Sequence, residues 1–218
     1  MIEKRDDFQL RNITRENLGQ VAEIHRKVFP ESILSSLDKK TIIKYYDWQM
    51  TPPNISYVIG AFNSESHLLG FCFAGSLRNA EIYFIQDNFI FFAAYFLRHP
   101  RLLFNHTLLS RLGHFLKNLR DHLIQGKWRR TKEQQVKSDR FGILAIAVNQ
   151  NFQRCGIGKI LMEDVVQYAK GKGYHKIELS VHPENQKAVS FYEKSGWKKV
   201  LYDHEKPWQG YLEKYLGS

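Results

Sequence analysis

Residues 149–197 read "NQNFQRCGIGKILMEDVVQYAKGKGYHKIELSVHPENQKAVSFYEKSGW", and they contain the most informative pattern of the sequence. Gly156 and Gly158 stand one residue apart, at the start of a segment that predicts a helix. The first N–H groups of a helix have no internal partner, and the helix dipole adds partial positive charge there. A glycine-rich turn that opens a helix is therefore a ready site for a phosphate group. Glycines at such a place can also serve the geometry of the turn alone.

Two familiar phosphate-binding motifs do not fit this stretch. A dinucleotide-binding motif needs G-x-G-x-x-G, but Leu161 stands where the third glycine belongs. A P-loop needs G-x-x-x-x-G-K-[ST], but here Ile160 follows Lys159. The pattern that remains is Q-x-x-G-x-G, which begins at Gln153 directly after an apolar strand. Arg154 and Lys159 add positive charge beside it, unless they are simply solvated surface charges.

The elements around the glycines predict a strand–helix–strand unit, which implies a right-handed parallel crossover. The segment "FGILAIAV" at 141–148 predicts a buried strand, 156–173 a helix and 176–181 a second strand. The helix should turn four side chains inward: Ile160, Leu161, Val165 and Tyr168. A short helix at 185–197 and two closing strands at 198–202 and 210–216 complete the C-terminal part.

The N-terminal part predicts a strand, two helices and a hairpin. Residues 8–14 alternate like a strand, and Thr14 can cap a helix that runs to about Val28. Residues 35–50 predict a second helix. The hairpin joins strands at 55–62 and 68–77, and both are apolar on both faces, so they should lie inside a covered sheet.

Residues 79–138 interrupt this alternation, and they predict a helical, basic insertion within a single domain of residues 1–218. Residues 98–140 contain eleven Lys and Arg against three Asp and Glu, a net charge of +8 out of +10 for the whole chain. Such a block is either a solvated face or an attraction for anions. The insertion is accordingly expected to be a cap over the sheet edge, a lid for a substrate, a dimer surface or a contact with a membrane surface.

The composition excludes several classes of protein. A hydrophobic fraction of 43% is enough for a core, and two cysteines, Cys72 and Cys155, exclude a disulfide framework. The first ten residues lack the apolar core of a signal peptide, and no run of about 18 apolar residues exists. Nine histidines show no metal-binding spacing, so no metal is expected. We therefore expect a cytoplasmic protein.

The sequence resembles the GNAT superfamily of acyl-CoA-dependent N-acetyltransferases in a combination of features. These are "QRCGIG", the helix after it, Asn185 after a strand, and "FYEKSGW" with Tyr192. The resemblance covers residues 8–78 and 139–216, and its specific part lies at 141–202. It implies an α/β fold, with a twisted, mostly antiparallel sheet of six or seven strands flanked by helices. It also implies that acetyl-CoA is the acyl donor.

The resemblance assigns a role to each part of the site. The strand before the loop should splay from its neighbour, so that the pantetheine arm of the donor binds the backbone of Ile146, Ala147 and Val148. The loop should hold the pyrophosphate through its backbone, together with Gln153 before it; the loop residues are Arg154, Cys155, Gly156, Ile157, Gly158 and Lys159. Asn185 should reach the arm, and Tyr192 should protonate the leaving thiolate. The Val148 N–H is the expected oxyanion donor.

Several of these residues have alternative interpretations. Tyr192 can be a packing residue, and Asn185 can cap the helix that follows it. Some relatives place a glutamate base five residues before the asparagine, but here Ser180 occupies that position. Glu178, on the same strand face, and Glu31 are the candidates that remain for the general base.

The sequence therefore predicts direct acetyl transfer from acetyl-CoA to a primary amine in a ternary complex. The basic insertion favours an anionic acceptor, such as an amino sugar or a sugar nucleotide. A protein N-terminus or lysine is the alternative acceptor. A catalytically silent CoA-binding module, or a basic nucleic-acid-binding module, is the alternative from another class, and nucleic acid is not the expected partner.

Overall fold

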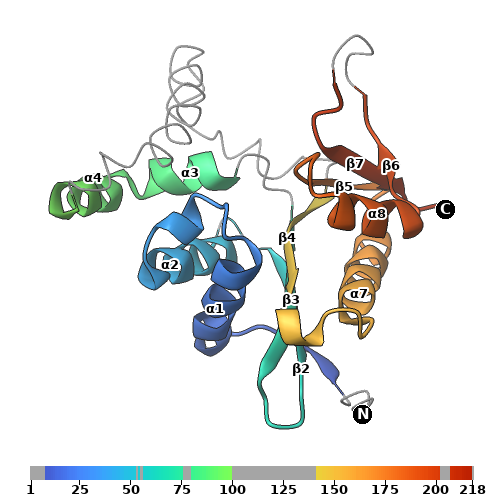
Figure 1. The fold of residues 1–218 in the computed structure, drawn as a ribbon, viewed down its shortest axis with the longest axis horizontal. Helices are drawn as coiled ribbons and strands as arrows, with labels where there is room; N and C mark the ends of the chain where they lie inside the picture. The colour runs from blue at the N-terminus through green and yellow to red at the C-terminus, as the bar shows by residue number, and fades with distance from the viewer. Residues whose placement is uncertain are drawn as a thin grey trace.

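Seven strands form one sheet in the computed structural model, which describes residues 8–52, 54, 56–75, 80–99, 141–201 and 207–217 (Figure 1). The strand order is β1-β2-β3-β4-β5-β7-β6, and only β4 and β5 pair in parallel. The strands are β1 Gln9–Asn12, β2 Tyr57–Phe62, β3 Leu68–Gly75, β4 Phe141–Val148, β5 Lys176–Ser180, β6 Lys198–Lys199 and β7 Tyr211–Tyr215. The predicted mostly antiparallel sheet and its parallel crossover are confirmed.

Helices cover the two faces of the sheet (Figure 1). On one face lie α1 Leu18–Val28, α2 Lys39–Met50, α3 Ala80–Asp87 and α4 Phe89–Arg98, packed through a cluster that contains Phe71 and Phe73 of β3. On the other lie α7 Ile157–Gly171 and α8 Gln186–Lys194, around a cluster that contains Cys72. Among the described residues, short 3₁₀ turns join these elements: η1 Arg15–Asn17, η2 Leu34–Ser36 and η4 Gln150–Phe152. The predicted succession of strands and helices along the chain is thus found in the part that the structure describes.

Capping residues set where the first two helices begin. Thr14 and Asn17 hydrogen-bond each other around η1, so the α-helix starts at Leu18, later than the sequence predicts. Asp38 caps α2 by accepting a hydrogen bond from the Thr41 N–H at 2.7 Å. A carboxylate there satisfies a helical donor that has no partner inside the helix.

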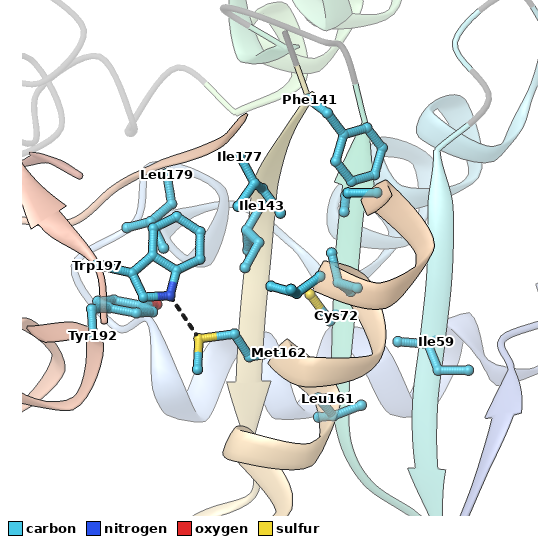
Figure 2. Packing of buried hydrophobic residues seen from close by; sticks show 14 of the residues in the cluster. Ile59, Cys72, Phe141, Ile143, Leu161, Met162, Ile177, Leu179, Tyr192 and Trp197 are labelled. Carbon is cyan, nitrogen blue, oxygen red and sulfur yellow. Dashed lines mark hydrogen bonds between the residues drawn. The ribbon is translucent and has the colours of Figure 1, made fainter. Parts of the chain in front are cut away.

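The core that supports α7 spans both halves of the sheet (Figure 2). Every residue of β3 is buried, as the apolar hairpin predicts. Leu161 and Met162 of α7 point into this core, and the Trp197 indole N–H donates to the Met162 sulfur at 3.1 Å. The core therefore fixes the direction from which α7 approaches the end of β4.

The predicted inward face of α7 is wrong at one position. Leu161 and Val165 are buried, and Tyr168 stacks half-buried on Tyr57 of β2. Ile160, however, is 38% exposed. It precedes Leu161 by one residue, which is about 100° around the helix, so it falls at the flank of the buried stripe.

The predicted insertion at 79–138 lies largely outside the described residues. Its described helices are α3 and α4: Phe84 of α3 packs on Tyr45 of α2, and Phe92 of α4 packs on Phe84. The single domain of 1–218, with this segment as its insertion, stays a prediction.

Candidate active site

The parallel pair β4–β5 is joined along less than half of β4. Phe141–Ile143 pair with Ile177–Leu179, and the paired register ends there. On its other edge β4 pairs with β3 as far as Val148. The two strands therefore diverge, and residues 144–148 present a backbone edge without a strand partner among the described residues.

The backbone groups at the end of β4 alternate between the two edges. The Asn149 N–H donates to the Leu69 carbonyl of β3 at 2.8 Å. Because neighbouring residues of a strand point their N–H and C=O groups to opposite sides, Ala147 also faces β3, whereas Ile146 and Val148 face the gap. The Val148 carbonyl accepts a hydrogen bond from the Gln153 side-chain amide at 3.1 Å. The Val148 N–H faces the gap by the same alternation.

The loop between β4 and α7 contains two residues in left-handed conformations. Arg154 has φ +68° and Gly156 has φ +87°. No protein partner is found among the described residues for the N–H groups of residues 154–158. These five donors lie at the N-terminus of a fifteen-residue helix, where the helix dipole also favours an anion. The loop therefore fits a phosphate or pyrophosphate.

The two glycines have different surroundings. Gly156 is needed for its backbone angle, since its φ is positive and a Cβ there would meet no atom within 4 Å. A Cβ at Gly158 would make ordinary van der Waals contacts, 3.5 Å from Val148 Cγ2 and 3.8 Å from the Phe191 ring, so the packing there does not require a glycine. The end of β4, the start of α7 and α8 thus converge at Gly158.

Of the other loop residues, one is buried in the core and the rest are exposed. Ile157 is buried and holds the start of α7 in the core. Arg154 and Cys155 are exposed, and the Cys155 thiol lies 3.7 Å from the Gln153 carbonyl. Lys159 is exposed and pairs with Glu163 at 3.7 Å, an interaction that is weak at a surface. Arg154 and Lys159 are thus both placed to supply charge to a bound anion.

Tyr192 follows Phe191 on α8 and is a member of the core (Figure 2). It is 8% exposed, and its ring meets that of Trp197 edge-on with centroids 6.0 Å apart. Burial raises the pKa of the Tyr192 phenol above its ordinary value, and the nearby Cys72 thiol adds to this shift. The predicted packing role is therefore present in the structure. The raised pKa also keeps the phenol protonated, which a proton donor requires.

Asn185 is the N-cap of α8. Its side-chain oxygen accepts a hydrogen bond from the Ala188 N–H at 3.2 Å, as the capping interpretation predicts. The side chain is exposed, so its amide N–H groups remain accessible to a ligand. The same residue can therefore cap the helix and donate to a bound molecule.

Neither predicted base has a described contact with Tyr192. Glu178 lies 3.2 Å from Lys176, which also pairs with Glu213 at 3.0 Å. These hydrogen bonds raise the pKa of Lys176. Glu31 is exposed in the segment between α1 and η2. Both remain predictions for the general base.

A buried histidine that contacts a tyrosine is a feature that the sequence motifs do not reveal. The His25 Nδ1 of α1 lies 2.8 Å from the Tyr46 hydroxyl of α2, and desolvation lowers the pKa of His25 to about 4. The Gln150 side chain of η4 donates to the Lys27 carbonyl at 3.0 Å, so the end of α1 lies against the loop after β4. The only sequence signal was that His25 falls on the apolar face of a helix.

The described residues contain no group of three His, Cys, Asp or Glu side chains that could hold a metal ion. In the same ranges, no helix has the length and apolarity needed to cross a membrane.

Comparison with known proteins matches this architecture. The sequence fits the Acetyltransferase (GNAT) family over residues 18–197. It is 32% identical over 66 residues to a ribosomal protein bS18-alanine N-acetyltransferase of Salmonella typhimurium. That match covers 30% of this chain and 45% of the relative, so it spans less than half of the relative's length.

Two solved structures share the fold over almost their whole length. An N-acetyltransferase from Staphylococcus aureus Mu50 has a TM-score of 0.57 at 14% identity, and the match covers 96% of this chain and 99% of that one. The PaiA N-acetyltransferase of Thermoplasma acidophilum, in complex with coenzyme A, has a TM-score of 0.52 at 15% identity, with the same coverage. Since the family match extends over most of the sequence, the chain belongs to the GNAT family of acyl-CoA-dependent N-acetyltransferases.

Proposed function

We propose that the protein transfers an acetyl group from acetyl-CoA to a primary amine while both substrates are bound. The observation that carries this proposal is the continuity between the unpaired edge of β4 and the loop of unpartnered N–H groups. A molecule whose extended arm is attached to a pyrophosphate, as in acetyl-CoA, can use both at once. Its arm hydrogen-bonds the Ile146 and Val148 backbone, and its phosphates accept from the N–H groups of residues 154–158.

The chain's own residues supply the groups that the transfer needs. The amine nitrogen forms a bond to the thioester carbonyl carbon, and the carbon–sulfur bond then breaks. The Val148 N–H points into the gap and is the donor for the oxygen on which negative charge develops. The buried Tyr192 phenol gives its proton to the departing sulfur. The amine loses a proton to Glu178, to Glu31 or to water.

Charge favours an anionic amine as the acceptor. Residues 98–140 contribute a net charge of +8, and a basic segment attracts an anionic substrate. An amino sugar or a sugar nucleotide combines a primary amine with such a charge. This acceptor class rests on sequence charge alone.

A protein N-terminal amine is the second candidate acceptor. The support is the relative named as a ribosomal protein alanine N-acetyltransferase, which shares 32% identity over 66 residues. A peptide acceptor would be distinguished from a sugar by activity on short peptides with a free N-terminus.

The test is a thiol-release assay with acetyl-CoA over a panel of amino sugars, sugar nucleotides and peptides. We expect turnover with at least one class, and we expect Tyr192→Phe to lose about tenfold or more in kcat with little change in acetyl-CoA Kd. Tyr174→Phe is the matched control, since Tyr174 stacks on Phe141 in the same core without an assigned role.

The outcomes separate the hypotheses. An unchanged rate for Tyr192→Phe would remove this residue from the mechanism. Binding of acetyl-CoA without thiol release from any amine would favour a silent module. Failure to bind acetyl-CoA would contradict the proposed function itself.

A further inference from the structure

α4 is apolar around its whole circumference. Its sequence is "FIFFAAYFLR", and Arg98 is its first charged residue. In a ten-residue helix such a composition leaves apolar side chains on the face that does not pack on the protein. Figure 1 places α4 at the periphery of the molecule, far from α7 and α8. One side of this helix is therefore turned toward the surroundings.

The buried and exposed sides of α4 are clearly separated. Phe92 is 5% exposed and packs edge-on against Phe84 of α3. Ile90 and Leu97, by contrast, are 84% and 83% exposed. They are seven residues apart, or about two helical turns, with the half-buried Ala94 between them. Ile90, Ala94 and Leu97 form what we call the α4 stripe.

Charges of both signs lie next to the α4 stripe, since Asp87 lies just before the helix and Asp38 lies near Tyr95; the excess of positive charge comes from the sequence that follows the helix. The Lys44 ammonium of α2 lies 5.3 Å from the centre of the Phe91 ring, and Arg98 ends the helix. No acidic residue occurs from Asn88 to His99, and the sequence from 98 to 140 carries eleven Lys and Arg against three Asp and Glu. The partner that complements an apolar stripe with flanking cations is an apolar surface with negative charge.

We propose that the α4 stripe docks on an anionic lipid bilayer, with the helix lying in the plane of the interface. A helix of ten residues is about 15 Å long, half of what is needed to span the hydrocarbon core, so insertion across the bilayer is excluded for α4. A second copy of the chain fits the stripe less well. Three side chains fall far short of the roughly 800 Å² that each partner of a stable complex usually buries.

The test is co-sedimentation with lipid vesicles of two compositions. We expect the full chain to partition onto phosphatidylcholine vesicles that contain about 30% phosphatidylglycerol, more strongly than onto phosphatidylcholine alone. We expect this preference to weaken as salt is raised, because surface charges are screened. The double variant Ile90→Glu/Leu97→Glu should lose about tenfold or more in partition coefficient.

A matched control separates the stripe from charge alone. The double variant Leu201→Glu/Tyr215→Glu adds the same two negative charges at other exposed apolar positions and should keep most of the binding. Thiol release with a soluble amine and the circular dichroism spectrum should be unchanged in Ile90→Glu/Leu97→Glu, since both side chains are exposed.

Three results would overturn the proposal. The first is the absence of any preference for anionic vesicles in the unmodified chain. The second is an equal loss of binding in the two double variants, which would leave only electrostatics. The third is a dimer in light scattering without lipid that Ile90→Glu/Leu97→Glu converts to a monomer, which would make a second copy the occupant.

Discussion

Arg154 and Gly156 bracket Cys155 in left-handed conformations, at the place where the loop turns into α7. For an L-residue such as Arg154 this conformation costs about 1–2 kcal/mol, so the surrounding structure must hold it in place. The Gln153 side chain does part of this by binding the Val148 carbonyl. The strain at Arg154 therefore lies in the same loop whose five N–H groups have no protein partner among the described residues.

Gly156 provides a test of this geometry, because Gly173 has nearly the same backbone angle at the other end of α7. Their φ values are +87° and +80°, and neither position has an atom within 4 Å of a new Cβ. We expect Gly156→Ala and Gly173→Ala to lose similar stability, about 1 kcal/mol each. Only Gly156→Ala should raise the acetyl-CoA Kd, by about tenfold, because only its N–H belongs to the phosphate site.

Urea unfolding and calorimetric titration measure the two quantities for this pair. An equal effect of both substitutions on acetyl-CoA binding would show that the loop acts through helix stability. In that case its N–H groups would have no direct part in binding.

At the scale of elements, α8 begins at a residue with two proposed tasks. The Asn185 oxygen caps the helix, while its exposed amide donors are accessible to a ligand. Asn185→Asp keeps the capping oxygen and removes the donors. We expect it to retain stability and to raise the acetyl-CoA Kd severalfold. Asn185→Ala should lose about 1 kcal/mol of stability as well.

Asp38→Ala is the matched control for the Asn185 pair. It removes the cap of α2, which accepts from Thr41, and should lose about the same stability without a change in acetyl-CoA Kd. Thermal unfolding measures the stability of the three variants, and calorimetric titration measures their acetyl-CoA Kd. If Asn185→Asp binds acetyl-CoA as the unmodified protein does, Asn185 is a cap and nothing more.

Local sequence patterns predicted the elements well and their junctions less well. The hairpin, the strand at 141–148 and the crossover helix follow from residue types within single segments, and the structure confirms them. Ile160 was predicted inward because it is apolar, but the phase set by Leu161 and Val165 turns it aside. The end of β4–β5 pairing at Ile143 is a matter of register between distant strands, which no local pattern encodes. The resemblance to a family supplied the expected splay instead.

At the scale of the whole molecule, His25 links stability to pH. Its pKa falls from 6.5 to about 4 because the ring is buried beside Tyr46. The unfolded chain therefore takes up the proton first as pH falls, and stability is lost between pH 6.5 and about 4. The loss should be about 3 kcal/mol, complete just below the folded-state pKa. Above pH 6.5 the contribution of His25 to the free energy of unfolding should no longer change with pH.

The measurement compares urea unfolding of the unmodified protein and His25→Gln at about pH 7 and about pH 4. Other acid-sensitive groups act equally on both proteins, so the difference between their losses isolates His25. The unmodified protein should lose about 3 kcal/mol more than the variant. Equal losses would mean that the imidazole takes up its proton in the folded state as readily as in water.

The sequence shows the positive charge of the chain directly, but it does not show which partner that charge attracts. A net +8 over residues 98–140 indicates an affinity for anions, and several partners satisfy that. The exposure of Ile90 and Leu97 on α4, which depends on how that helix packs, is what adds an anionic lipid surface to these candidate partners. The acceptor and the general base depend likewise on distances between segments far apart in the sequence.

Side-chain contacts to β2 hold the middle and the C-terminal half of α7 against the sheet. The Tyr57 hydroxyl of β2 donates to the Asp164 carboxylate at 2.6 Å, and the Tyr57 ring stacks on Tyr168 at 3.8 Å between centroids. A helix held there cannot swing freely at its opposite end, where the N–H groups proposed to bind phosphate lie. Ordering a residue costs roughly 1–2 kcal/mol in lost conformational freedom, and here folding has already removed that freedom before any ligand arrives. The loop is thus preorganised, and acetyl-CoA should bind with a small entropic penalty from the protein.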